Sequence, residues 1–91
     1  MKRSRRHRIL MLPSAKRQLL QVREPARNQI RGAIRDLADD PTPPDSLAMV
    51  GKAVGLHRLR VGMYRVVYRI QDGRLIVLII RIGHRREVYG R

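Results

Sequence analysis

The residues of this chain that could do chemistry are arginines spaced as in β-strands. One residue separates Arg58 from Arg60 in the segment Leu56–Val61, so a strand there would place both on one face. Arg65 has the same parity as Arg69 in the next β-rich stretch. Guanidinium groups bind phosphate oxygens in pairs, which suits the backbone of a nucleic acid. The spacing therefore predicts an arginine-bearing sheet face that could hold RNA or DNA.

The charge of the whole chain agrees with such a partner. Lys and Arg number 21 against 7 Asp and Glu, which gives a formal net charge of +14. Only Lys2, Lys16 and Lys52 are lysines, although an arginine bias can also reflect a GC-rich genome. The balance predicts a polyanionic partner. An anionic membrane is the weaker alternative, because no basic stretch forms a helix with a strong apolar face.

The composition also bears on the compartment and the domain organisation. The chain has no Cys, and the apolar run behind its basic start is only Ile9–Leu12, closed by Pro13. Such a run is typical of a short edge strand and is too short for an export signal or a membrane span. We expect a cytoplasmic protein with no membrane partner, in which residues 1–8 form a basic arm and residues 9–91 a single domain.

The first half of that domain is predicted to be a helical hairpin. Apolar residues recur at helical spacing from Ser14 to Val22, with Ser14 placed to cap the first turn. Pro25 suits the first turn of a second, longer helix that reaches Leu37. The proline-rich stretch 41–44 ends this helix and begins a loop.

The second half is predicted to be an antiparallel meander of three strands. The strands are Leu56–Val61, Tyr64–Gln71 and Leu75–Ile82, joined by turns at 62–63 and 72–73. The expected order is β-α-α-β-β-β, which is an α+β fold with the helices packed on one face of the sheet. Since the helices must cover one face, the arginine-bearing face should be the open one.

The segments LHRLRVGMYRVVYRI and DGRLIVLIIRIGHRREVYGR resemble the C-terminal half of RelE-type toxins in the RelE/ParE superfamily. PSAKRQLLQV and IRGAIRDLADDPTPP resemble the helical hairpin and loop of that family, so the resemblance covers nearly everything from Ile9 to Arg91. It implies a type II toxin that cleaves mRNA in the ribosomal A site without metal or cofactor and so inhibits translation. The implied partners are the ribosome and mRNA, a cognate acidic antitoxin that wraps the toxin, and operator DNA indirectly through that antitoxin.

The resemblance also implies roles for individual residues. Arg65 would hold the phosphate, Arg85 would stabilise or protonate the leaving oxygen, and Tyr89 would orient the 2′-OH or stack on a base. The expected contacts to RNA and the ribosome are Arg58, Arg60, Arg69, Arg81 and Arg86.

The proton acceptor is left open. Arg58 and Arg60 occupy positions where well-known RelE-type enzymes carry lysines, and arginine is a poor base. Tyr89, less favourably His57 or His84, or the ribosome itself would have to accept the proton.

Other interpretations of the same residues stay open. A ParE-like toxin would share the fold but inhibit DNA gyrase, and a noncatalytic nucleic-acid-binding module would explain the charge alone. Arg58 and Arg60 could be the solvated side of an amphipathic strand. Tyr64 and Tyr68 are expected in the core or on the sheet, and His57 against the helices.

Overall fold

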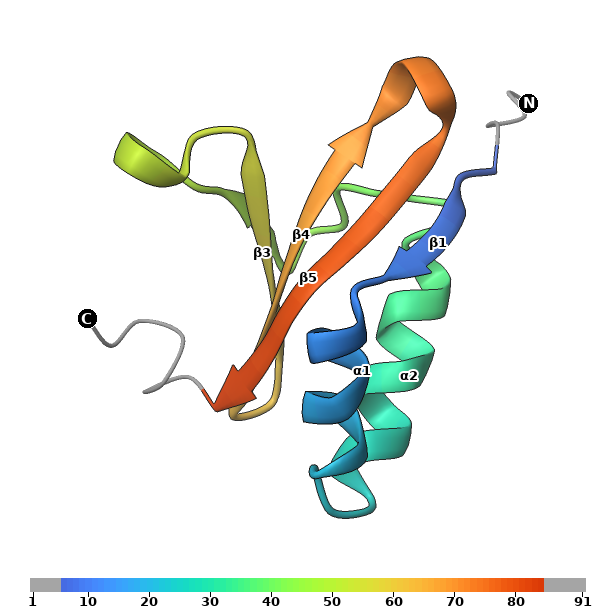
Figure 1. The fold of residues 1–91 in the computed structure, drawn as a ribbon, viewed down its shortest axis with the longest axis vertical. Helices are drawn as coiled ribbons and strands as arrows, with labels where there is room; N and C mark the ends of the chain where they lie inside the picture. The colour runs from blue at the N-terminus through green and yellow to red at the C-terminus, as the bar shows by residue number, and fades with distance from the viewer. Residues whose placement is uncertain (1–5, 85–91) are drawn as a thin grey trace.

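Two helices and a five-stranded sheet make up the computed structural model, which describes residues 6–84. Both helices lie on the same side of the sheet (Figure 1), and this leaves the other face open. The α+β order expected from the sequence is confirmed. The elements are β1 (Arg8–Met11), α1 (Pro13–Leu20), α2 (Ala26–Asp36), β2 (Ser46–Ala48), η1 (Gly51–Ala53), β3 (Leu56–Val61), β4 (Tyr64–Gln71), η2 (Asp72–Arg74) and β5 (Ile76–His84).

The strands are ordered β1-β5-β4-β3-β2 across the sheet. Strands β3, β4 and β5 form the expected antiparallel meander. At one edge β1 runs parallel to β5, with Ile9 opposite Val77. At the other edge β2 pairs antiparallel with β3, and this short strand was not expected from the sequence. Strand β1 begins at Arg8, so the sheet includes one residue of the predicted arm.

The helix boundaries follow the prolines. Helix α1 begins at Pro13, whose fixed backbone angle suits a first helical turn. The prediction that Ser14 caps this helix is wrong, because Leu12 is the N-cap residue and no side chain caps the turn. Helix α2 begins at Ala26, directly after Pro25. No helix among residues 6–84 is long and apolar enough to cross a bilayer.

The hydrophobic core lies between the helices and the sheet. Ile30 and Leu37 are fully buried on the helix side, and Val66 and Ile79 are fully buried on the sheet. Each such side chain contributes about 1.5–3 kcal/mol through removal from water. Tyr68 is also fully buried, so one phenol joins an otherwise aliphatic core, as the sequence indicated for this residue.

A β-bulge changes which face of β5 points to the core. Val67 is opposite Arg81, but the next residue, Tyr68, is opposite Ile79, so Ile80 has no partner in the ladder. A regular strand would place residue 81 on the same face as Ile79, beneath the helices. The extra residue inverts this alternation. Arg81 is therefore exposed, and Ile82 is buried beside Ile79.

Hydrogen bonds attach the loop 41–45 to the sheet. The Tyr68 hydroxyl donates to the Pro41 carbonyl oxygen at 2.6 Å. The Ser46 hydroxyl donates to the Pro43 carbonyl oxygen at 2.7 Å. The Arg60 amide donates to the Asp45 carbonyl oxygen at 3.1 Å. These bonds fix the loop 41–45 at the β2 edge of the sheet.

Candidate nucleic-acid interface

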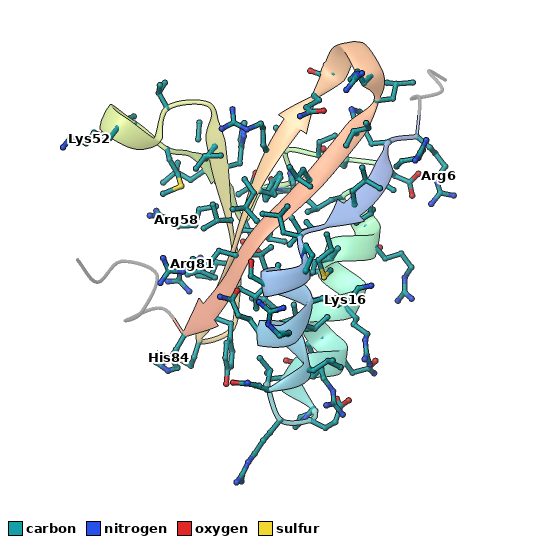
Figure 2. All side chains as sticks on the ribbon, in the orientation of Figure 1. Arg6, Lys16, Lys52, Arg58, Arg81 and His84 are labelled. Carbon is teal, nitrogen blue, oxygen red and sulfur yellow. The ribbon has the colours of Figure 1, made fainter. Side chains whose placement is uncertain are left out.

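Arginines from three neighbouring strands share the open face of the sheet. Across the strands Arg58 is opposite Val67, which is opposite Arg81. One step along, Arg60 is opposite Arg65. Figure 2 shows Arg58 and Arg81 projecting from the side of the sheet away from α1. The prediction that the arginine-bearing face is the open one is confirmed.

Three of these arginines line one hollow. Its volume is about 230 Å³, and its walls come from β3, β4 and the entry to β2. Polar groups dominate the lining, and the guanidinium groups give it a positive charge that suits an anionic ligand. The lining residues are Pro44, Asp45, Ser46, Leu47, Arg58, Arg60 and Arg65.

Arg65 is the most buried arginine among the described residues, with 6% of its surface exposed. Its Nη1 donates to the carbonyl oxygens of Tyr64 at 3.1 Å and Gly62 at 3.4 Å. A buried charge needs such partners, because an unpaired one would cost several kcal/mol. The residue opposite Arg65 on β5 is Gly83, which brings no side chain against it. Arg65 thus holds the β3–β4 turn and also lines the hollow.

The other expected RNA contacts are placed less uniformly. Arg81 is exposed in the row that contains Arg58. Arg69 is also exposed, but it is opposite Leu56, toward the far end of β4, and does not line the hollow. Arg85, Arg86 and Tyr89 lie outside the described residues.

The histidines considered as proton acceptors lie away from the arginine hollow. His57 is on the helix-covered face, stacked on Tyr68 with ring centroids 5.5 Å apart. This agrees with the expectation that it packs toward the helices. His84 contacts Tyr64 edge to face at 5.7 Å, beside a separate hollow of about 350 Å³ that Gln18 also lines. Within the described part of the chain, neither histidine lines the hollow of Arg58, Arg60 and Arg65.

One pKa near this region is clearly perturbed. Burial raises the pKa of the Tyr68 phenol above its ordinary value. The Ser46 hydroxyl opposes this change by hydrogen bonding, and the negative charge of Asp40 adds to it. Tyr68 is therefore a neutral hydrogen-bond donor in the fold, in keeping with its bond to Pro41.

Asp45 lines this hollow, although its place there was not expected from the sequence. It follows the prolines of the 41–44 stretch and was assigned with them to the loop. The pattern that could have revealed it is the spacing of two residues between Asp45 and Leu47. Leu47 lies in β2, opposite Arg58 of β3, so Asp45 shares the face of Arg58. Recognising that pattern requires knowing that Ser46–Ala48 is a strand.

The same fold occurs in solved toxin structures. The structure is similar to the RelBE2 toxin-antitoxin complex from Mycobacterium tuberculosis, with a TM-score of 0.78 and 25% identity over 87% of this chain and 98% of that one. It is also similar to the archaeal RelE-RelB complex from Pyrococcus horikoshii OT3, with a TM-score of 0.77 and 21% identity over 87% and 94% of the two chains. A third match is the YoeB/ParE toxin from Agrobacterium tumefaciens, with a TM-score of 0.74 and 16% identity over 85% and 96%. The fold is therefore that of a small toxin of toxin–antitoxin systems.

The sequence itself supports the same class. Residues 9–89 match the family described as ParE toxin of type II toxin-antitoxin system, parDE. The chain belongs to the RelE/ParE superfamily of type II toxins, as its motifs indicated. A search of curated proteins gave no significant match. Several of the similar structures are complexes of a toxin with its antitoxin.

Proposed function

We propose that this toxin is a ribosome-dependent mRNA endonuclease that cleaves in the A site and so inhibits translation. The observation that carries the proposal is the hollow on the open sheet face, which brings Arg58, Arg60 and Arg65 together. In the proposed reaction the 2′-OH of the mRNA attacks the adjacent phosphorus. The transition state gathers negative charge on the phosphoryl oxygens, and positioned guanidinium groups stabilise that charge. Arginines can supply this stabilisation without a metal ion.

Further arginines would bind the RNA and the ribosome around the hollow. Arg81 and Arg69 are exposed and suit phosphate contacts, and we assign the same role to Arg86. We keep Arg85 as the residue that stabilises or protonates the leaving oxygen and Tyr89 as the one that orients the 2′-OH or stacks on a base. These assignments follow the resemblance of the segment GHRREVY to RelE-type toxins.

The experiment compares arginine variants by primer extension on mRNA under translation. Arg58→Ala and Arg60→Ala should each slow cleavage at least about tenfold. A charged hydrogen bond contributes about 1.5–3 kcal/mol, and 1.4 kcal/mol corresponds to tenfold. Arg74→Ala is the matched control, because Arg74 is an exposed arginine in the β4–β5 connection. If the first two variants cleave as fast as Arg74→Ala, the hollow is not the site.

Arg65→Ala should abolish cleavage, but it also removes the hydrogen bonds that hold the β3–β4 turn. Its unfolding must therefore be measured beside its activity. Arg65→Lys keeps the charge and loses the guanidinium fork, so a folded but slow Arg65→Lys variant would assign the loss to phosphate binding.

The family description ParE toxin favours one second candidate, inhibition of DNA gyrase. Induction of the toxin distinguishes the two. Arrested translation with cut mRNA supports the endonuclease, and a DNA damage response with intact mRNA supports the gyrase inhibitor. Salt-sensitive RNA binding without cleavage would instead indicate a noncatalytic module.

We also propose where an acidic antitoxin binds. An apolar groove of about 540 Å³ lies between β1 and the two helices, with Leu20 58% exposed at its edge. Lys16, Arg31 and Arg35 line the same groove, so an amphipathic antitoxin segment with acidic side chains would find both apolar and charged partners there. The similar toxins that were solved with antitoxins favour this occupant. Loss of antitoxin affinity in Leu20→Ala, without loss of mRNA cleavage, would support the assignment.

A further inference from the structure

Among residues 6–84, one carboxylate lines the arginine hollow, that of Asp45, and the Asp45 backbone is hydrogen-bonded to the sheet. Arg60 donates its amide hydrogen to the Asp45 carbonyl oxygen at 3.1 Å, one residue beyond the pair of Ser46 and Leu59. Asp45 thus extends the β2–β3 ladder. Alternate residues of a strand share a face, and Leu47 is opposite Arg58 on the open face. Asp45 therefore belongs to that face, in the row that continues through Arg60 and Arg65.

Three other carboxylates of the described residues have charged partners of their own. Glu24 pairs with Arg27, Asp39 with Arg6, and Asp72 contacts His7. Asp45 is in none of the ion pairs among residues 6–84, and it is the one acid there that lines the arginine hollow. It is exposed to solvent, so a substrate can reach it. The bonds of Tyr68 to Pro41 and of Ser46 to Pro43 hold the segment that precedes it.

We propose that Asp45 is the catalytic base of the mRNA cleavage, an assignment that rests on the function proposed above. The Asp45 carboxylate accepts the proton of the 2′-OH as the bond from that oxygen to phosphorus forms. The bond from phosphorus to the 5′ oxygen breaks, and the 5′ oxygen takes a proton from water. Asp45 then returns its proton to the hydroxide so formed. The products are a 2′,3′-cyclic phosphate and a 5′-hydroxyl end, with no net change in protons.

The arrangement divides the chemistry between two kinds of side chain. An arginine remains protonated and cannot accept the proton, whereas an ionised carboxylate can. Neighbouring strands lie about 5 Å apart. A phosphate held between Arg60 on β3 and Arg65 on β4 is therefore within reach of the side chain opposite Arg60 on the next strand. Asp45 occupies that position.

A purely electrostatic role makes the opposite prediction. If Asp45 only added a negative charge among the arginines, its removal would make the hollow more positive. Asp45→Asn would then bind mRNA more tightly and stabilise the phosphoryl charge at least as well. A catalytic base predicts slower chemistry in the same variant, so the direction of the change separates the two roles.

The test measures single-turnover cleavage on ribosomes that carry a defined mRNA, with toxin in excess. We expect Asp45→Asn to slow cleavage at least about 100-fold, the usual loss on removal of a general base. Its ribosome affinity should stay equal or become tighter. Asp45→Glu should recover part of the rate. Asp36→Asn, the same substitution at an exposed residue of α2, is the control and should cleave at the wild-type rate.

Three results would overturn the assignment. Cleavage by Asp45→Asn at or above the wild-type rate excludes a catalytic base while the endonuclease proposal stands. Weaker ribosome binding with an unchanged rate at saturation makes Asp45 a binding residue only. Failure of the wild-type chain to cut mRNA on the ribosome refutes the proposed function and, with it, the role of Asp45.

Discussion

Substitution of Tyr68 by Phe tests how the loop beside the arginine hollow is held in place. The Tyr68 hydroxyl is the donor of a 2.6 Å hydrogen bond to the Pro41 carbonyl oxygen. The ring itself is fully buried and stacked on His57. Phe keeps the ring and its packing and removes only the donor. The change therefore isolates the attachment of the 41–45 loop to β4.

The structure sets the expected magnitude. A hydrogen bond of this kind contributes about 0.5–1.5 kcal/mol net, and leaving its carbonyl partner unsatisfied raises the loss toward about 2 kcal/mol. For a domain of this size each kcal/mol corresponds to about 4–8 °C in Tm. We expect Tyr68→Phe to lose about 1–2 kcal/mol and to melt roughly 5–15 °C lower.

Urea denaturation and thermal melts measure this loss, with Tyr64→Phe as the matched control. Tyr64 is partly buried and packs against the core, but its hydroxyl makes no hydrogen bond to the residues described by the structure. Tyr64→Phe should therefore change the free energy of unfolding by less than about 0.5 kcal/mol. Equal stability of the two variants would refute the argument that the phenol anchors the loop. If Tyr68→Phe lowers the rate of mRNA cleavage by more than it lowers the folded fraction, the loop also positions the site.

Three other predictions concern the fold. Burial raises the pKa of the Tyr68 phenol above 10.0, its value in the unfolded chain, so the folded chain keeps the phenolic proton to higher pH. This contribution to stability is complete below about pH 10 and is lost as the pH rises through the folded pKa, which urea denaturation at alkaline pH would detect. Ile30→Ala should cost about 2–5 kcal/mol, and Leu20→Ala about 0.5 kcal/mol or less, in the same assay, because Ile30 is fully buried and Leu20 is not. Deletion of Ile80 removes the extra residue, so Arg81 would follow Ile79 directly and stay on the open face, and we expect this variant to fold and to unfold cooperatively in urea. A deletion variant that fails to fold would contradict this reasoning.

Local patterns predicted most of the fold. The alternation around Arg58 and Arg60 gave β3 and its open face, and Gly62, with a φ of 59°, forms the tight turn to Tyr64. The second hairpin was predicted at 72–73, but its connection is longer and places Leu75 in the left-handed region with a φ of 56°. Boundaries of this kind depend on how the two strands register, which turn residues alone do not determine.

Features that depend on pairing between distant segments could not be predicted from the sequence. The short strand β2 is defined by its pairing with β3, and it brings Asp45 beside the arginines. The bulge at Ile80 lies at the end of an apolar run, in which no alternation of polar and apolar residues marks the change of face. Of the catalytic residues expected, Arg65 lines the hollow and Arg85 and Tyr89 lie outside the described residues, and the catalytic roles of all three stay predictions.

The parallel pairing of β1 with β5 has a consequence for the order of folding. Strand β1 is made first and its hydrogen-bonding neighbour last, so Ile9 must wait for Val77 before the sheet can be completed. Contacts so distant in sequence close late and slow folding. During synthesis the sheet cannot be completed until β5 has been translated. For a toxin proposed to attack translating ribosomes, this delay would keep a nascent chain inactive until β5 has been made.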